Sequence, residues 1–425
     1  MTNENSLTRR DFIKTASAAS MVSLAGALSG TGALFASGSD TIRVGLIGCG
    51  GRGTGAAIDA VNSSPGVEIL ALYDPFQDRL DSCLKRLRER VPAAVKVKSE
   101  ACFTGFDGYQ KLLAIKDVNY IVTAAPPGFR PIHLKAIVEA GKNVFMEKPV
   151  AVDPVGVRSV IRSSELAAQK GLAIVAGTQR RHQQRYLELM KRIGDGAIGE
   201  VVGGQCYWNQ GDLWVVKQTP EMSDMEWQCR NWLYFTWTSG DHIVEQHVHN
   251  IDVINWAFGA MPVKVMGMGG REVRTAPEYG NIFDHFAVEF EYPNGARVMS
   301  MCRQTKGCAD RVEERIVGTK GHAFGYGEIH GPNAWKFEAD EPNPYVQEHA
   351  DLIASIRAGK PLNEGRQIAE STMCAIIGRM SAYTGSAISW NWAMNASKLD
   401  LTPKTFEFGP NPVDPAAVPG VTKLV

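Results

Sequence analysis

The sequence predicts an α/β protein in which an N-terminal doubly wound parallel sheet is followed by an α+β domain with a large, mostly antiparallel sheet. Two observations support this prediction. Up to about residue 179, short apolar runs typical of strands alternate with helical segments, which is the pattern of βαβ units. Beyond about residue 200, strand-like runs follow one another without long helices between them, which favours an antiparallel arrangement.

In the first part, β-branched and apolar runs that end in glycine or a charged residue predict buried strands. These strands are expected at 41–48, 67–74, 119–127, 143–149 and 172–179. The helices between them are expected at 54–64, 77–90, 130–142 and 161–171. We place the first domain at 41–160 and the second at 161–395.

In the second part, strands are expected at 201–211, 263–270, 286–304 and 315–327. The third run alternates apolar and polar residues and then turns at Pro293-Asn294-Gly295, which predicts a hairpin. We expect one face of the sheet to pack on helices such as one near 245–257, and the other to face water or a second subunit. A homo-oligomer is therefore expected.

Near the end of the chain, residues 364–384 have helical periodicity, and Gly385 is a natural stop. The last segment, 396–425, is rich in proline and is expected to be extended.

Residues 1–40 have the composition of an export signal. Arg9, Arg10 and Lys14 precede an uncharged stretch at 15–36 that is rich in alanine, serine and glycine. This order predicts a twin-arginine signal, cleaved near Ala36, which exports a folded protein to the periplasm. The stretch is too weakly apolar to predict a membrane span, so no membrane anchor is expected after cleavage.

The overall composition excludes some classes of partner and site. Lys+Arg and Asp+Glu both number 45, so the surface gives no electrostatic reason to expect nucleic acid or an anionic membrane as a partner. The 8 cysteines form no CxxC pair and have no zinc-finger spacing, which favours buried, unpaired side chains.

The turn after the first strand has the spacing G-x-G-x-x-G. It comprises Gly48, Gly50, Gly51, Arg52 and Gly53. Because this turn joins a predicted strand to a predicted helix, it indicates a Rossmann domain that binds a dinucleotide pyrophosphate.

An acidic residue ends the second expected strand, 21 residues after Gly53. This residue, Asp74, can accept hydrogen bonds from the adenosine ribose and would repel a 2′-phosphate. The sequence therefore predicts NAD rather than NADP.

Glu147, Lys148 and Pro149 end the fourth expected strand. Ligands of doubly wound sheets bind at the carboxyl ends of the strands, so Glu147 and Lys148, with Pro126 after the third strand, are expected beside the cofactor. The proline restricts Lys148 to extended backbone, and a cis bond at this position would aim the ammonium sharply.

The glycine turn, Asp74, the AAPP sequence at 124–127 and the MEKPV sequence at 146–150 resemble the Gfo/Idh/MocA oxidoreductase family. The resemblance covers roughly residues 41–395. It implies that His249 corresponds to the family's acid/base histidine and that helix 364–384 packs back on the cofactor domain. Glu245 stands where the family usually has an aspartate, and His247 where it usually has a glycine.

The same residues suit alcohol oxidation. A neutral histidine such as His249 can take the hydroxyl proton near pH 7, and Lys148 can stabilise the developing alkoxide. We expect Glu245 and His249 on one face of a helix, four residues apart, with Asp252 orienting the imidazole. Glu245 and His249 also suggest a metal cluster with His242 and His247, but positions 247 and 249 point apart on a helix, so no metal is expected.

An aromatic run at 227–237 precedes this helix, and such rings commonly stack on sugars. Trp227, Arg230 and Trp232 are therefore candidate substrate residues, with Asp252 also expected at the substrate. Arg181 and Tyr186, which follow the strand at 172–179, are further candidates for binding sugar hydroxyls.

A folded, exported protein that uses NAD must keep its cofactor, because no cytoplasmic pool can replace it. We therefore expect tightly bound NAD that is reset on the enzyme, as in an oxidoreductase acting on sugar hydroxyls. Glycoside cleavage through transient oxidation and elimination satisfies the same constraint. A sugar-binding protein that retains a non-catalytic NAD fold is the third hypothesis.

Overall fold

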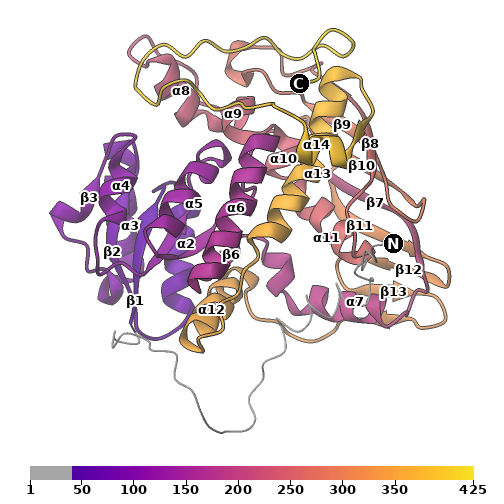
Figure 1. Cartoon of the computed structure of the whole chain (residues 1–425), viewed down its shortest axis with the longest axis horizontal. Coiled ribbons are helices and arrows are strands. Elements are labelled where there is room, and N and C mark those ends of the chain that lie inside the picture. Colours follow the sequence, from indigo (N-terminus) through magenta and orange to yellow (C-terminus); the bar gives the residue numbers. More distant parts are fainter. Residues whose placement is uncertain (1–40) are drawn as a thin grey trace, which may run out of the picture.

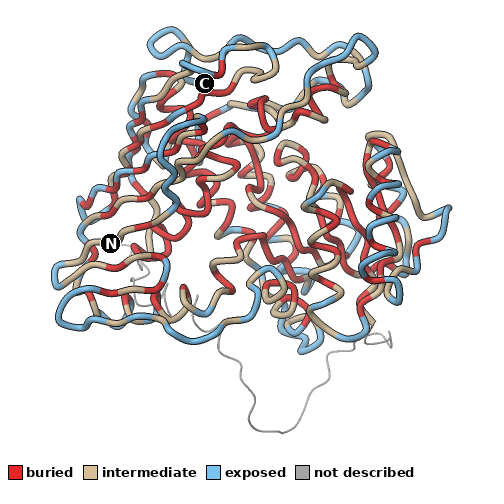
Figure 2. Tube along the Cα trace, turned by 180° about the vertical axis from the view of Figure 1, so that it is seen from behind, coloured by how far each residue is buried: buried red, intermediate tan, exposed pale blue. Residues whose placement is uncertain are grey.

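The computed structural model describes residues 41–425, which form two packed α/β parts (Figure 1). The predicted twin-arginine signal lies outside the described residues. In Figure 2, the buried residues are concentrated in the strands and in the helices between the two sheets, while the outer loops are exposed. Within residues 41–425, no helix is both long enough and apolar enough to cross a membrane.

The first sheet has six parallel strands in the order β3-β2-β1-β4-β5-β6, as expected of a doubly wound domain. Its strands are β1 Ile42–Ile47, β2 Val67–Tyr73, β3 Cys102–Phe103, β4 Tyr120–Thr123, β5 Asn143–Met146 and β6 Ile174–Ala176. The helices of this part are α2 Gly51–Ser63, α3 Gln77–Arg90, α4 Gly108–Leu113, α5 Arg130–Glu139 and α6 Pro154–Lys170. The expected boundary at residue 160 falls inside α6, because β6 still belongs to this sheet.

The second sheet has nine strands in the order β14-β13-β12-β11-β7-β10-β9-β8-β15, and of its pairs only β7 with β10 is parallel within the described residues. Its strands are β7 Val201–Gln210, β8 Lys264–Gly270, β9 His285–Glu291, β10 Arg297–Gln304, β11 Arg311–Gly318, β12 Gly321–Phe324, β13 Glu328–His330, β14 Trp335–Lys336 and β15 Ile388–Ser389. The predicted hairpin is β9 and β10, and the run expected as one strand at 315–327 is split into β11 and β12.

The remaining helices follow β6 in the sequence. They are α7 Gln184–Gly194, α8 Asp224–Arg230, α9 Thr236–Ser239, α10 His242–Glu245, α11 Val248–Phe258, α12 Pro344–Arg357, α13 Gly365–Thr384 and α14 Trp390–Asn395. Among them, α10, α11 and α13 pack on the large sheet (Figure 1). Short 3₁₀ turns follow β4 at Pro127–Phe129 and β6 at Gln179–His182.

One helix from the end of the chain packs against both parts, and another packs on the first part. Helix α13 packs between α6 of the first part and β8 and α11 of the second, which matches the expected returning helix. Helix α12, which the sequence pattern did not predict, packs against α2. Because α13 buries apolar side chains against both parts, it holds the first part against the second.

The other face of the large sheet exposes methionines. Met266 and Met268 on β8 are 58% and 70% exposed, and Met299 and Met301 on β10 are 39% and 38% exposed. All four flank β9, since Met266 and Met299 both pair with Glu289, and Met268 and Met301 both pair with Ala287. The face expected to meet a second subunit is therefore apolar at its centre.

Candidate active site at the carboxyl edge of the parallel sheet

The glycine turn between β1 and α2 is shaped by contacts that exclude side chains. Gly48 has φ +94°, and a Cβ at this position would lie 2.7 Å from the backbone nitrogen of Ala125. A Cβ on Gly53 would lie 1.9 Å from the carbonyl oxygen of Gly48. In contrast, a Cβ on Gly50 or Gly51 would meet no atom within 4 Å, so the backbone here is open to a ligand. This cradle fits a dinucleotide pyrophosphate at the N-terminus of α2.

Asp74 follows β2 directly and is buried. Its carboxylate accepts hydrogen bonds from the backbone amides of Cys49 at 2.8 Å and Phe76 at 3.0 Å. Burial raises the pKa of Asp74, although these two hydrogen bonds oppose the shift. Each carboxylate oxygen has a second lone pair, so Asp74 is placed beside the turn with acceptor capacity left for a ribose.

Lys148 lies at the end of β5 and contacts the second part of the molecule. Its Nζ donates to the carbonyl oxygen of Glu245 at 2.7 Å and to Glu245 Oε1 at 3.2 Å. The Lys148–Pro149 peptide bond is cis. Lys148 and Glu245 thus form a polar contact between the cofactor domain and the start of the α10–α11 region.

His249 is buried near this pair. Its ring is stacked on Trp208 of β7, with 5.8 Å between ring centroids. Burial lowers the pKa of His249 well below its usual value, and the positive charges of Lys148, Arg180 and Arg52 lower it further. The imidazole is therefore neutral at pH 7, and it lies within electrostatic range of Lys148.

The helix expected near 245–257 is interrupted, and this corrects two expectations. Helix α10 ends at Glu245 and α11 begins at Val248, so Glu245 and His249 do not share a helix face. Asp252 does not orient His249: it accepts two hydrogen bonds from the Arg181 guanidinium, at 2.7 and 2.9 Å, and one from Ser371 at 2.7 Å. The sequence contains no glycine or proline at 246–247, so nothing in its pattern indicated the break.

Arg181 and Tyr186 are buried and are bound to other side chains. Arg181 pairs with Asp252, and its guanidinium lies over the Trp256 ring at 4.7 Å. The Tyr186 hydroxyl donates to Glu314 at 3.4 Å. Their neighbour Arg180, not Arg181, lies near the Trp208 ring, and its charge helps to lower the pKa of His249.

The residues of the aromatic run lie toward α3 and the 213–216 loop. The Trp227 Nε1 donates to the carbonyl oxygen of Val216 at 2.7 Å, and Trp232 packs edge-on against Trp214. Arg230 makes two hydrogen bonds of 3.0 Å to Asp78 at the start of α3. The structure therefore gathers Lys148, Glu245 and His249. It places Trp227, Arg230 and Trp232 at a different part of the edge.

Arg52 and Glu147, expected beside the cofactor, are ion-paired with each other. Arg52 also lies 3.4 Å from Glu348 of α12, and its guanidinium is 4.9 Å from the centre of the Tyr345 ring. Burial opposes the charge of Arg52, but these carboxylates raise its pKa above the usual value. This pairing links the glycine turn, the end of β5 and α12.

Arg130 is a site residue that the sequence analysis missed. It is fully buried in α5 and donates to the carbonyl oxygens of Ala125 and Glu147, which tie the ends of β4 and β5 together beside Pro126. Burial lowers its pKa to about 10. Carbonyl partners leave no sequence signal, so this role could not be predicted.

Trp208 was also missed, although its position on a strand offered a signal. Trp208 follows Gly204 and Cys206, both buried, at two-residue intervals on β7, so it lies on the same face of the sheet as they do. That face is covered by α11, which contains His249.

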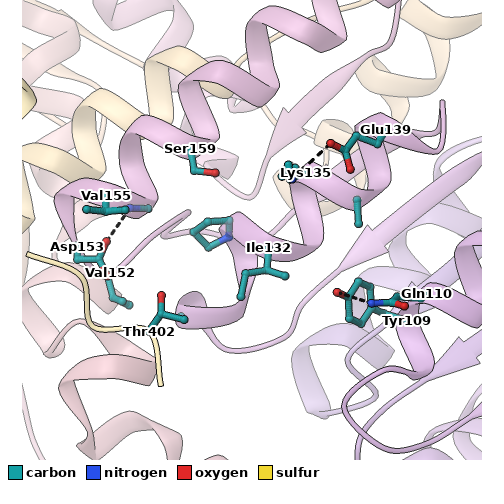
Figure 3. Close-up of a pocket in the computed structure, with 14 residues that line it drawn as sticks. Tyr109, Gln110, Ile132, Lys135, Glu139, Val152, Asp153, Val155, Ser159 and Thr402 are labelled. Carbon is teal, nitrogen blue, oxygen red and sulfur yellow. Dashed lines mark hydrogen bonds and ion pairs between the residues drawn. The ribbon is translucent and has the colours of Figure 1, made fainter. Parts of the chain in front are cut away.

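Two other features of the described residues bear on ligand binding. Figure 3 shows a cavity of about 510 Å³ between α4, α5 and α6, bordered by Asp153, Ser159 and Thr402. It lies among the helices of the first part, and its lining does not include Lys148, Glu245 or His249.

Within residues 41–425, no group of three or more His, Cys, Asp or Glu side chains is arranged to hold a metal ion. His242 pairs with Asp241, and His247 contacts Ser300.

Comparison with protein families matches both parts of the chain. Residues 42–178 match the oxidoreductase family with an NAD-binding Rossmann fold, and residues 186–324 match the GFO/IDH/MocA C-terminal domain. The chain belongs to the Gfo/Idh/MocA family of oxidoreductases. Its cofactor is NAD, in agreement with the glycine turn and Asp74.

Individual relatives are distant. The chain is 23% identical to inositol 2-dehydrogenase of Rhizobium meliloti over 66% of this chain and 74% of that protein. It is 27% identical to a glycosyl hydrolase family 109 protein of Streptomyces niveus over 65% of this chain and 54% of that protein. Across these and two other curated relatives, the matched part spans between 54% and 74% of the relative's length.

A crystal structure of scyllo-inositol dehydrogenase from Lactobacillus casei, with bound NAD(H) and scyllo-inositol, has the same fold. The two structures align with a TM-score of 0.63 at 17% identity, over 82% of this chain and 99% of that chain.

Proposed function

We propose that this protein oxidises a hydroxyl group of a sugar or sugar-like polyol with NAD that remains bound between turnovers. The observation that supports the proposal best is the contact of Lys148 with Glu245 beside a buried, neutral His249. When bound, NAD supplies the hydride acceptor. The family relatives named for inositol oxidation make a polyol substrate the natural first choice.

In this proposal, His249 accepts the proton of the substrate hydroxyl while the hydride leaves the same carbon. A neutral imidazole is required for this step, and burial beside three cations keeps it neutral. The Lys148 ammonium stabilises the negative charge that develops on the oxygen, and Glu245 holds this ammonium in place. Trp208, stacked on His249, offers an apolar wall for the sugar ring.

The proposal includes retention of NAD and export of the folded protein. An enzyme in the periplasm has no supply of dinucleotide, so a cofactor loaded before export must be reset by a second substrate or within the same turnover. Denaturing the purified protein and identifying the released nucleotide by mass spectrometry tests retention. N-terminal sequencing of the protein from periplasmic and cytoplasmic fractions tests export and cleavage near Ala36.

Glycoside cleavage by transient oxidation is the second candidate, and the relative named as a glycosyl hydrolase family 109 protein favours it. Oxidation of one carbon acidifies the neighbouring C–H, elimination expels the aglycone, water adds, and the ketone is reduced again. This cycle uses the same Lys148 and His249 and returns NAD to its starting state.

Two measurements separate the hypotheses. A panel of polyols and sugars is added to the holoenzyme while the near-ultraviolet absorbance of reduced nicotinamide is followed. A stable rise supports the oxidoreductase, whereas release of nitrophenol from an aryl glycoside without such a rise supports the glycosidase. Tight sugar binding with neither signal would contradict catalysis and leave a sugar-binding protein.

A further inference from the structure

A segment after α14 crosses the carboxyl ends of three parallel strands. Phe406 packs against Phe129, with 5.3 Å between ring centroids, and Phe408 packs against Phe106 at 4.9 Å and Phe76 at 5.7 Å. Phe129 follows β4, Phe106 follows β3 and Phe76 follows β2, so the contacts lie at the carboxyl edge of the sheet. In Figure 1, the segment runs along the top of the molecule from α14 to α8.

The segment is anchored at both ends by hydrogen bonds. At one end, the backbone amide of Leu401 donates to Asp153 Oδ2 at 2.9 Å. At the other end, Asn411 and Gln228 of α8 exchange two hydrogen bonds, and the Asn411 amide donates to Asp224 at 3.1 Å. Residues 401–411, which we call the crossing segment, therefore connect the start of α6 to α8.

Helix α8 reaches the same place from the other side. The Arg230 guanidinium lies 4.0 Å from the centre of the Phe76 ring and pairs with Asp78. The carbonyl oxygen of Arg230 accepts a hydrogen bond from Arg79 at 3.3 Å. Phe76 is thus in contact with both Arg230 and Phe408, and only 4% of its surface is exposed.

Phe76 lies next to the part of the turn that is expected to bind adenosine. Phe76 lies two residues after Asp74, whose carboxylate accepts a hydrogen bond from its backbone amide. In a doubly wound sheet, the adenosine half of a dinucleotide binds at the end of the second strand, where such an acid contacts the ribose. The crossing segment and Arg230 thus contact Phe76, two residues after the acid expected to bind the adenosine ribose.

We propose that the crossing segment and Arg230 form a cover over the adenosine end of the NAD site and set the rate at which the dinucleotide leaves. Phe406 and Phe408 seal the cover through aromatic contacts, and Asp153 and Gln228 fix its two ends. The cover is part of the cofactor site, so this inference rests on the proposed retention of NAD, while its test does not depend on the proposed sugar oxidation.

The test uses the full-length holoenzyme and the double variant Phe406→Ala/Phe408→Ala. Bound NAD is labelled isotopically, and its release into excess unlabelled NAD is followed over time. We expect release to be about tenfold faster in the variant, because the aromatic contacts of residues 406 and 408 with Phe129, Phe106 and Phe76 are lost. The control is Val421→Ala, which changes a side chain that is 74% exposed, and its release rate is expected to match the parent protein.

Two further variants make the result independent of folding. Phe408→Leu alters a side chain that is 48% exposed and keeps apolar volume, so its thermal unfolding should be unchanged while release is accelerated by a smaller factor. Arg230→Met should accelerate release without changing Phe406 or Phe408.

Unchanged release in all three variants would overturn the proposal. Tighter NAD binding in the double variant would also overturn it, since the phenyl rings would then occupy the nucleotide's place. Both outcomes are read from labelled NAD, so they stand whether or not any polyol is oxidised.

Discussion

Two ion pairs near α11, one of Arg181 and the other of Lys148, differ in how many side-chain hydrogen bonds they make. Arg181 and Asp252 form a bidentate pair in which the aspartate also accepts from Ser371, and both side chains are at most 6% exposed. Lys148 and Glu245 share a single side-chain contact, and they are 15% and 12% exposed. Within residues 41–425, His249 makes no side-chain hydrogen bond.

This difference distinguishes a structural pair from a reactive one. Both carboxylate oxygens of Asp252 are paired in a buried site, so loss of this ion pair is expected to lower the stability of the protein. A lysine and a histidine with unused hydrogen-bonding capacity can bind a substrate hydroxyl, so replacing either residue is expected to lower kcat. The predictions below test this contrast, from the largest expected effect to the smallest.

Replacing Arg181 with alanine should destabilise the protein by about 3–5 kcal/mol, because Asp252 would remain buried without its partner. The free energy of unfolding in urea measures this effect. The double variant Arg181→Ala/Asp252→Ala should recover part of the loss. A single variant as stable as the parent protein would show that the pair is not structural.

Replacing Lys148 with alanine should lower kcat by about 10²–10³-fold and destabilise the protein less than Arg181→Ala does, since Lys148 and Glu245 share one side-chain contact and are more exposed than the Arg181–Asp252 pair. Steady-state rates on the best polyol measure the effect. Lys148→Arg keeps the charge and should retain intermediate activity. A large fall in stability with normal kcat would place Lys148 in the structural class instead.

His182 should make the stability depend on pH in a defined direction. Burial opposes its charge, but Glu364 and Asp351 raise its pKa to about 10. Because this value is above that of the unfolded chain, about 6.5, the stabilisation is complete below pH 6.5 and is lost as the pH rises toward 10. The difference in unfolding free energy between the parent and His182→Gln should shrink by up to about 1.4 kcal/mol per pH unit over this range. A constant difference would contradict the assignment.

His249 should give a small but diagnostic effect on the pH profile. Its lowered pKa means that it is already neutral at pH 7 and stays neutral on mild acidification. We therefore expect kcat/KM to be flat through pH 6.5, the usual histidine pKa, and to fall only at lower pH. An acidic limb centred near 6.5 would indicate an exposed histidine or a different base.

The sequence predicted the parts of the site that depend on local pattern. The glycine turn, Asp74 and the Glu147-Lys148-Pro149 strand end lie where predicted, because each is defined by a strand and the residues that directly follow it. The fold class was also predicted, since the change from alternating helices and strands to successive strands is visible in the sequence.

Partners from distant segments could not be predicted in the same way. Arg181, Tyr186 and Asp252 were expected at the substrate, but they bind buried groups that lie far from them in the sequence. Trp227, Arg230 and Trp232 were expected at the substrate because aromatic rings stack on sugars and this run precedes the segment with His249. Instead, Arg230 pairs with Asp78 of α3, and both tryptophans contact the 213–216 loop. The break between α10 and α11 contains no helix-breaking residue, so no local pattern predicted it.

The most direct test of the central claim is a single turnover of the bound NAD in the parent protein and in His249→Ala, at saturating polyol. Near-ultraviolet absorbance follows nicotinamide reduction, and the ketone product is identified by mass spectrometry. The account predicts full reduction in the parent and a rate about 10²–10⁴-fold lower in the variant, with the same amount of bound NAD. Equal rates in the two proteins would contradict the role of His249 as the group that accepts the hydroxyl proton.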